Sequence, residues 1–465
     1  EVAPGLRHLG VMLPYTPLHM LLFEEGPDVM VMTSGNPTGL PLCTDENEAR
    51  ERLNHIADAF LIHNRPIHVP CDDSVMQVAD DEPFFHRRSR GFVPAPVRVS
   101  TVGPAVLGAG GDMKNAFCLV QGQRAVFSQH LGDMETEEGR AGFRRALDHL
   151  TRLAGIAPAL VAYDLHPGYH SSALARELPG IEAHTGVQHH HAHMAACMAE
   201  NGLADRTIGL VLDGTGYGHD GAIWGFEVLA GGLDEVQRIA HLAYSPLPGG
   251  EAAIRRPIMA ATGLVGAHLG GNGLARLRAV VRGGADVNEA MFTAARLMGA
   301  KLNSPEVGSA GRLFDAVSAM LGICQRQTYE GQAAIELGAV AAPVVGPAYP
   351  VGLDGDRYQV GSLLDGILGD LEKKVSPDRI AGRFLATVVE MVTVGARRAR
   401  EQTGFTTVCL SGGTFQSAFL LQRVTDRLTE DGFRVCRHRE VPPGDGGLAL
   451  GQAMVALRRW QRTCV

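Results

Sequence analysis

Four histidines stand within five residues of this chain, in the run Val187–His193 with the sequence VQHHHAH. The residues that follow, Met194–Glu200, are good helix formers without Gly or Pro, so we expect a helix here. Positions four apart on a helix share one face, with Cβ atoms about 5–6 Å apart. His189 and His193 can therefore offer two imidazoles to one divalent metal. A single histidine is more often a hydrogen-bonded core residue, but four together indicate a metal or substrate site.

A carboxylate flanked by glycines near the end of the chain is the first candidate for the missing ligand. Asp445 stands in the turn Pro442–Gly447, where a plain helix N-cap is the alternative role. With His189 and His193 it would leave open positions for a substrate, as catalytic metal sites require. Asp213, in front of a glycine-rich run, is the competing carboxylate, and it also suits a phosphate-bound metal or water. Imidazole and carboxylate together suit iron or zinc alike.

Glycine-rich turns follow three predicted strands, and each is a candidate nucleotide contact. Glycines let backbone N–H groups approach a phosphate or ribose, and a following helix N-terminus adds partial positive charge. Ordinary turn chemistry is the alternative for all three. The candidate residues are Asp112 and Lys114 in the first turn, Gly214 and Gly216 in the second, and Gly412, Gly413, Thr414 and Gln416 in the third.

Further polar residues suit a triphosphate or a nucleotide. Ser34 and Asn36 offer hydroxyl and amide groups at a predicted strand end, and Arg88 and Arg90 belong to a cluster of three arginines. The alternative for the arginines is a solvated basic turn. Gly311 and Asp315 are also taken as cofactor contacts, although Asp315 and Arg312, three residues apart, could form only an intrahelical pair.

The composition is that of a soluble globular protein. The chain has 465 residues, 45% hydrophobic and 20% charged, which predicts two or three domains. A net charge of −8 argues against nucleic-acid binding as the main activity. The eight cysteines form no C-x-x-C pair, and no apolar run is long enough for a membrane span, so a cytoplasmic protein is expected. The chain begins with Glu1, so we expect that something upstream was removed or omitted.

Periodicity predicts an α/β unit at residues 1–97 and a second domain at 104–465. In the first unit, strands are expected at 29–33 and 59–62, with a helix between them at 45–59. In the second, a strand, a glycine-rich turn and another strand occur twice, about 100 residues apart, which suggests a two-lobed nucleotide-binding fold in the style of actin, hexokinase and Hsp70. Residues 250–350 look helical and form an insertion. The predicted elements that follow are a hairpin at 353–360, a long helix at 379–402, a strand at 406–410, a helix at 417–429, a strand at 434–437 and a helix at 448–460.

Taken together, these motifs resemble the HypF family of [NiFe]-hydrogenase maturation carbamoyltransferases. The first unit is similar to the C-terminal half of a YrdC-like domain, and the remainder to a carbamoyltransferase domain related to TsaD. The motifs occur in the family's order over nearly the whole chain: Ser34–Asn36, Asp72–Val75, Arg87–Gly91, Gly110–Asn115, Val187–His193, Asp213–Gly218, Gly311–Asp315, Thr414–Gln416 and Asp445–Gly447.

The resemblance implies a reaction that starts from carbamoyl phosphate and ATP. Carbamate is joined to AMP, and the last domain passes the carbamoyl group from carbamoyl-adenylate to the C-terminal cysteine of HypE. A metal held by His189, His193 and Asp445 would act as a Lewis acid, with Asp213 as a fourth catalytic group and Mg²⁺ as a further candidate ion.

The sequence also departs from the family. The acylphosphatase domain, the C-x-x-C zinc fingers and the front half of the YrdC-like domain are absent, so the chain is not expected to hydrolyse carbamoyl phosphate. Ser417 stands where Asn is expected, and Leu385 where His is usual. The alternatives are a carbamoyltransferase for another acceptor, either a natural product or, as in TsaD, a tRNA, and a non-enzymatic nucleotide-binding scaffold.

Overall fold

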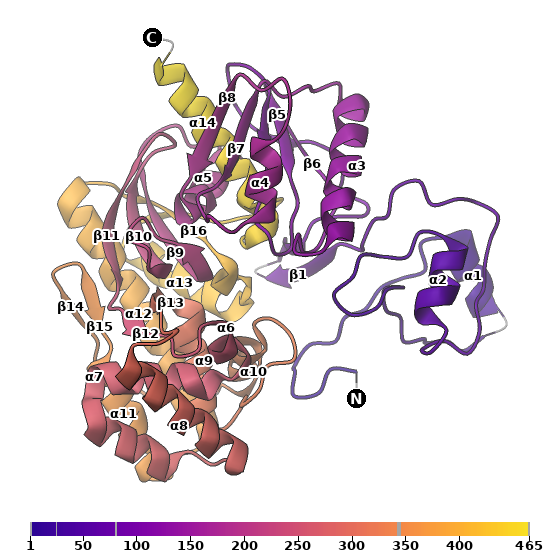
Figure 1. The fold of residues 1–465 in the computed structure, drawn as a ribbon. Helices are drawn as coiled ribbons and strands as arrows, with labels where there is room; N and C mark the ends of the chain where they lie inside the picture. Colours follow the sequence, from indigo (N-terminus) through magenta and orange to yellow (C-terminus); the bar gives the residue numbers. More distant parts are fainter. Residues whose placement is uncertain (1, 25, 80, 342–345, 464–465) are drawn as a thin grey trace. The chain divides into compact units, whose positions relative to one another are not determined.

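The computed structural model describes residues 2–24, 26–79, 81–341 and 346–463. Contacts between Cα atoms divide the chain into two compact units, Glu1–Pro70 and Cys71–Val465. Each unit is described by itself, and Figure 1 shows the elements of both.

The first unit has two short helices, α1 (Pro17–Glu24) and α2 (Glu46–Leu53). Asp45 caps α2 by accepting the backbone N–H groups of Asn47 and Glu48. The prediction of strands at 29–33 and 59–62 was wrong, and the helix predicted for 45–59 ends at Leu53. No described side chain of residues 1–70 is buried. A strand needs neighbouring strands and a buried face, and these segments find neither.

The second unit opens with a hairpin and continues into a six-stranded sheet. The hairpin pairs β1 (Val75–Ala79) with β2 (Glu82–Arg87). The sheet has the order β3-β6-β5-β4-β7-β8. Its strands are β3 (Val97–Arg98), β4 (Val106–Gly108), β5 (Cys118–Gln121), β6 (Arg124–Phe127), β7 (Leu160–Asp164) and β8 (Ala183–Val187).

Helices cover both faces of this sheet because successive strand residues point to opposite sides. Val106 packs in one core with α5 (His189–Glu200) and α14 (Leu448–Thr463). Its neighbour Leu107 packs in another core with α3 (Glu137–Ala154) and α4 (His170–Arg176). The predicted cluster of histidines thus begins a buried helix on one face of the sheet.

A second, nine-stranded sheet has the main order β14-β15-β11-β10-β9-β16-β17, with β12 and β13 off this path. The predicted pairing of strands around the second glycine-rich turn is confirmed by the antiparallel β9 and β10, but the predicted turn is misplaced: residues 214–217 belong to β9, and the connection lies at 218–222. The strands are β9 (Thr207–Tyr217), β10 (Ile223–Gly231), β11 (Val236–Leu242), β12 (Ser245–Pro246), β13 (Glu306–Ser309), β14 (Gly352–Asp354), β15 (Arg357–Gln359), β16 (Thr407–Ser411) and β17 (Arg434–Cys436).

The region 250–350 is largely helical, as predicted, but it also contains β13, which the sequence analysis missed. This strand pairs with β12 and runs parallel to β10. Residues 342–345 lie outside the described residues. The helices of the region are α6 (Glu251–Arg255), α7 (Pro257–Val280), α8 (Ala285–Ala300), α9 (Ala310–Met320) and α10 (Gln332–Val340).

The last third of the chain supplies the remaining helices, α11 (Gly361–Glu372), α12 (Pro377–Thr403) and α13 (Ala418–Glu430). The predicted long helix, α12, continues through Gly395, where a Cβ would lie 2.2 Å from the hydroxyl of Tyr358. Two short 3-10 turns, η1 (Gly413–Gln416) and η2 (Asp445–Gly447), follow β16 and precede α14. Among the described residues, no helix is long and apolar enough to cross a membrane.

Candidate active site

Four side chains with metal-ligating atoms converge at the start of α5. The Nε2 atom of His189 is 3.2 Å from Oδ2 of Asp213 and 3.7 Å from Oδ1 of Asp445. The Nε2 atom of His193 is 3.8 Å and 3.6 Å from the same two oxygens. The structure therefore brings together the four residues predicted for the catalytic centre, all within 4.8 Å of one another. We call them the tetrad.

The donor atoms of the tetrad fit a shared divalent cation. His193 Nε2 is buried and has no hydrogen-bond partner among the described residues. Three of the four imidazole–carboxylate separations exceed the length of a hydrogen bond. Ligand atoms about 2.1 Å from one ion lie roughly 3.0 to 3.4 Å apart at angles between 90° and tetrahedral. The four imidazole–carboxylate separations, 3.2 to 3.8 Å, lie within or slightly above that range.

His189 is held by two carboxylates. Its Nδ1 lies 2.8 Å from Oδ2 of Asp164, and its Nε2 faces Asp213. Burial by itself would lower the pKa of His189, but Asp164, Asp213 and Asp445 outweigh it and raise the pKa well above its usual value. Asp213 is also buried, yet its pKa is lowered because the imidazoles of His189 and His193 stabilise the carboxylate.

Two strands, one 3-10 turn and the start of α5 set these positions. Asp164 ends β7, Asp213 lies within β9, and Asp445 opens η2. Gln188 caps α5 by accepting the N–H of His191, and its amide also donates to the carbonyl of Tyr217 in β9. At Gly216 a Cβ would lie 2.4 Å from Cε1 of His190 and 2.9 Å from Cδ2 of His189, so β9 passes directly against the histidines.

A cavity of about 230 Å³ includes two members of the tetrad in its lining and has cationic residues in its wall. The pKa of His130 is lowered to about 3 by burial and by the charges of Arg87 and Lys114, so this imidazole is neutral. Burial opposes the charge of Lys114, but Glu330 and the aspartates raise its pKa. The lining residues with ionisable side chains are His86, Arg87, Arg88, Lys114, His130, Asp213, Glu330 and Asp445.

The third glycine-rich turn borders the same cavity. Gly413 and Gln416 line it, and the N–H of Gly413 donates to Oδ1 of Asp213 at 3.0 Å. Gly412 has φ 98°, and a Cβ there would lie 2.2 Å from the carbonyl oxygen of Leu212. This backbone therefore comes close to the tetrad only because glycine occupies the turn.

Three segments of the chain match models of known protein families. Residues 209–452 match a model described as the second subdomain of a carbamoyltransferase Kae1-like domain, and residues 101–200 match the HypF Kae1-like domain. The chain belongs to the HypF family. Residues 1–89 match the Sua5, YciO and YrdC model, which is described as telomere recombination. The family resemblance found in the sequence is confirmed.

Curated HypF relatives are similar over almost all of this chain. The carbamoyltransferase HypF2 of Cupriavidus necator is 40% identical over 98% of the chain and 62% of its own length. A probable carbamoyltransferase HypF of Methanocaldococcus jannaschii is 33% identical over 97% of the chain and 59% of its own length. The chain thus spans about six-tenths of such relatives.

Solved HypF structures have the same fold. A full-length HypF in a phosphate- and nucleotide-bound form superposes with a TM-score of 0.91 at 38% identity, covering 98% of this chain and 71% of the other. HypF of T. kodakarensis gives a TM-score of 0.88 at 33% identity, covering 99% of this chain and 61% of the other. The predicted fold class, a YrdC-like part followed by a Kae1-like two-lobed α/β domain, is confirmed.

Some residues predicted to bind the cofactor have other partners in this HypF chain. Asp112 accepts the N–H groups of His170 and Ser171 and so caps α4. Lys114 forms an ion pair of 2.8 Å with Glu330 while lining the cavity. Thr414 lies in η1, beside the cavity-lining Gly413.

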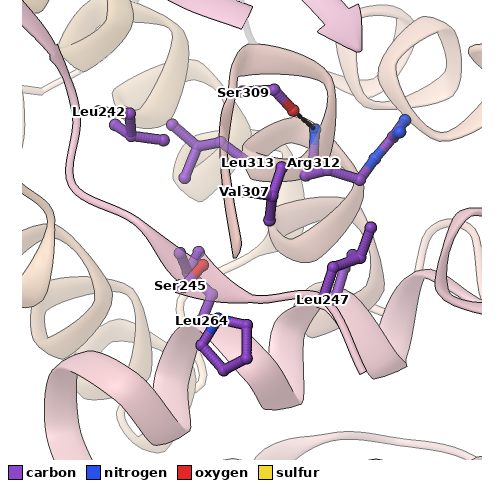
Figure 2. Close-up of a pocket in the computed structure, with 10 residues that line it drawn as sticks. Leu242, Ser245, Leu247, Leu264, Val307, Ser309, Arg312 and Leu313 are labelled. Atoms are coloured by element: carbon purple, nitrogen blue, oxygen red, sulfur yellow. Dashed lines mark hydrogen bonds between the residues drawn. The ribbon is translucent and has the colours of Figure 1, made fainter. Parts of the chain in front are cut away.

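The residues predicted at the start of α9 hold that helix in place. A Cβ at Gly311 would lie 2.7 Å from the Cα of Gly214, so the two glycines mark a close approach of α9 to β9. Asp315 pairs with Arg312 at 2.7 Å, which is the intrahelical alternative, and accepts the amide of Gln327. Figure 2 shows a void beside this helix, where the Ser309 hydroxyl accepts the N–H of Arg312. At about 10 Å³ this void holds at most one water molecule.

The predicted residues of the arginine cluster and of the first unit also have partners within the chain. Arg88 is buried, donates to the carbonyl of Ala95 and lines the cavity. Arg90 pairs with Asp73 at 3.1 Å. In the first unit, Asn36 donates to the carbonyl of Leu40, and Ser34 accepts the N–H of Asn36 through its own carbonyl.

Sequence reasoning missed Asp164 and the histidines of the cavity wall. Asp164 ends a predicted buried strand two residues before His166, whose N–H it accepts. A carboxylate at the end of a buried strand was the available signal. His86 and His130 carried no spacing signal, because only the fold places them beside Lys114.

Proposed function

We propose that this chain transfers a carbamoyl group from carbamoyl-adenylate to the C-terminal cysteine thiol of a HypE-type acceptor, for the cyanide ligands of [NiFe]-hydrogenase. The observation that carries the proposal is the convergence of the tetrad with a cavity that three cationic side chains line, in a chain of the HypF family. Because the chain spans about six-tenths of its relatives, formation of the adenylate from ATP and carbamoyl phosphate is proposed for the whole protein.

The cavity wall supports an anionic donor substrate. Arg87, Arg88 and Lys114 place three cations along one cavity, and charge-assisted hydrogen bonds from such groups are among the strong contacts to phosphate. Neutral His130 adds a polar group without further positive charge. We assign the phosphate of the adenylate to this wall and its ribose to the turn at Gly412, Gly413, Thr414 and Gln416.

We place the carbamoyl group of the adenylate at the tetrad. Asp164 fixes the ring of His189 through Nδ1, so that Nε2 points towards Asp213 and Asp445. A divalent iron or zinc ion bound by the tetrad would supply Lewis-acid polarisation of the carbamoyl carbonyl. The cations of the cavity wall stabilise the negative charge on AMP as it leaves.

The proposed transfer is an acyl substitution. The acceptor cysteine enters as the thiolate, and its sulfur forms a bond to the carbamoyl carbon. The bond from that carbon to the phosphate oxygen breaks, and AMP leaves with the electron pair. Buried Asp213 and His189 exclude water from one side of the reacting group, which protects it from hydrolysis.

Further proposals concern the domains, the ATP contacts and the location of the protein. Residues 1–97 would form the end of a YrdC-like domain, in which Ser34, Asn36 and Arg90 contact ATP, and residues 104–465 the transferase domain with its insertion at 250–350. Mg²⁺ would accompany the ATP, and a cytoplasmic location suits the acceptor.

The test supplies carbamoyl-adenylate and a HypE-type acceptor to the purified chain and follows the acceptor by mass spectrometry. The proposal expects one added carbamoyl group on the terminal cysteine. Substitution His193→Ala should abolish this product, whereas His184→Ala, at an exposed position of β8, should not. No added mass with folded, metal-loaded protein would overturn the proposal. Modification of another class of acceptor, but not of the HypE-type acceptor, would overturn the proposed acceptor.

A further inference from the structure

The carboxylate of Glu200, at the far end of α5 from His189, gathers four donors. Its Oε1 accepts the backbone N–H groups of Arg439, at 2.7 Å, of Glu440, and of Val441, at 3.3 Å. Its Oε2 lies 2.9 Å from Nδ1 of His438. Only 5% of this side chain is exposed. One buried carboxylate thus fixes four consecutive residues, 438–441, to the end of α5.

The contact continues through His438 to the third glycine-rich turn. Nε2 of His438 lies 2.9 Å from the hydroxyl of Ser411, the last residue of β16. With Nδ1–H donating to Glu200, a neutral His438 leaves Nε2 to accept the proton of the Ser411 hydroxyl, which also lies 3.4 Å from the carbonyl oxygen of Pro443. This order of acid, imidazole and hydroxyl is the one found in serine hydrolases. Ser411 has no exposed surface, however, and does not line the cavity, so it has no access to a substrate.

The segment that Glu200 holds leads directly to the tetrad. Three residues, Pro442, Pro443 and Gly444, separate Val441 from Asp445, and the fixed φ angles of the two prolines limit their conformations. The carbonyl of Pro443 also accepts the N–H of Gly412 at 2.9 Å. The position of Asp445 is therefore restrained by the short segment that precedes it and by the hydrogen bond between that segment and the turn at Gly412.

We infer that Glu200, through His438 and Ser411, is a positioning residue that sets the distance of Asp445 from His189 and His193. The inference rests on the proposed function, because it concerns the geometry of the same metal site. The Glu200 carboxylate thereby connects three elements: α5, which carries the two imidazoles; β16, which leads into the nucleotide turn; and the segment that carries Asp445.

The test compares Co²⁺ binding of the full chain and of Glu200→Gln by isothermal titration calorimetry. The amide keeps the size and the oxygen that accepts from residues 439–441, but it presents N–H to Nδ1 of His438, which donates to the carboxylate in the unmodified chain. Outer-shell substitutions lower metal affinity by about 10 to 100-fold, and we expect a loss of about tenfold here. The matched control is Asp370→Asn in α11, which breaks a half-buried ion pair with Arg383 of α12. This control should destabilise the fold but bind Co²⁺ as the unmodified chain does.

The outcomes separate this inference from the proposed function. Unchanged Co²⁺ affinity in Glu200→Gln, or an equal loss in the control, would overturn the inference. If Glu200→Gln does not fold, Ser411→Ala carries the same test with an expected loss of severalfold. If the unmodified chain binds no Co²⁺, the metal site of the proposed function fails. Hydrogen exchange of residues 442–447 then decides the inference, with faster exchange in the variant supporting it and unchanged exchange overturning it.

Discussion

At the scale of single residues, the chemistry depends on which nitrogen of His189 carries a proton. Asp164 accepts from Nδ1, and this leaves Nε2 as the atom that faces the other members of the tetrad. A carboxylate behind a ligating histidine fixes both the ring orientation and the tautomer.

Substitution Asp164→Asn should therefore weaken metal binding by about 10 to 100-fold. The amide N–H₂ would face Nδ1 and move the proton of the neutral ring to Nε2, which then cannot ligate. Calorimetric titration with Co²⁺ measures this effect. Asp356→Asn is the control, because Asp356 lies 3.9 Å from His241 Nε2 in a histidine–aspartate pair outside the tetrad. Equal affinities for the unmodified chain and Asp164→Asn would contradict the assigned role.

Metal affinity should also increase with pH. The neighbouring aspartates raise the pKa of His189 in the metal-free protein, so the ring holds a proton more tightly than a free imidazole and must lose it on binding. Below that pKa, each displaced proton lowers the apparent affinity about tenfold per pH unit. Titrations between about pH 6 and 8.5, in buffers of different ionisation enthalpy, should show tighter binding at high pH with proton release. A flat profile without proton release would be inconsistent with this site.

The members of the candidate site could be predicted from the sequence where helical spacing or flanking glycines indicate the position of a side chain. His189 and His193 followed from their spacing, and Asp445 from a carboxylate enclosed by glycines. Asp112 had the same glycine context, yet it caps α4. Turn sequence alone does not distinguish a cap from a ligand, because the same carboxylate oxygen can accept from backbone N–H groups or bind a cation.

At the scale of elements, close backbone contacts hold the histidine helix in place. Gly451 of α14 faces α5, and a Cβ there would lie 1.7 Å from the carbonyl oxygen of Ala192. Gly108 of β4 meets Ala449 of α14 in the same way, with a distance of 1.9 Å. The small residues at these positions let α14 lie between the first sheet and α5.

Substitution Gly451→Ala should destabilise the protein by about 1–3 kcal/mol or more, because the added methyl forces the two helices apart. Gly142→Ala, inside α3, is the matched control, since nothing lies within 4 Å of its Cβ position. There the higher helix propensity of Ala should stabilise the protein by up to about 1 kcal/mol. Urea denaturation measures both changes, and a neutral Gly451→Ala would show that the helices do not pack as described.

Most elements of the second unit could be predicted because their hydrophobic periodicity agrees with the tertiary structure. Strand β13 was missed because its four residues, with glycine and serine among them, carry too little periodic signal. The strands predicted in the first unit were wrong for a different reason. Segments such as 29–33 have strand composition, but composition forms a strand only where a neighbouring strand completes its hydrogen bonds.

At the scale of the whole molecule, the two units differ in how much they bury. No described residue of 1–70 is buried, whereas the second unit contains every hydrophobic core cluster described. Local stability follows buried apolar contact, so the first unit should open far more readily than the second.

Limited digestion with trypsin should therefore begin in the first unit, after Arg7, Arg50 and Arg52. The fragment that begins at Leu53 should persist and keep its metal affinity. Mass spectrometry of a digestion time course identifies the sites. Early cleavage within the second unit at a similar rate would contradict the burial described for it.

The most direct test of the central claim is a crystal structure of the chain loaded with Co²⁺, with anomalous differences recorded at the cobalt edge. We predict one strong peak per chain, about 2.0–2.2 Å from Nε2 of His189 and His193 and from carboxylate oxygens of the tetrad. A metal-loaded crystal with no peak among these four residues, or with its peak elsewhere, would contradict the account.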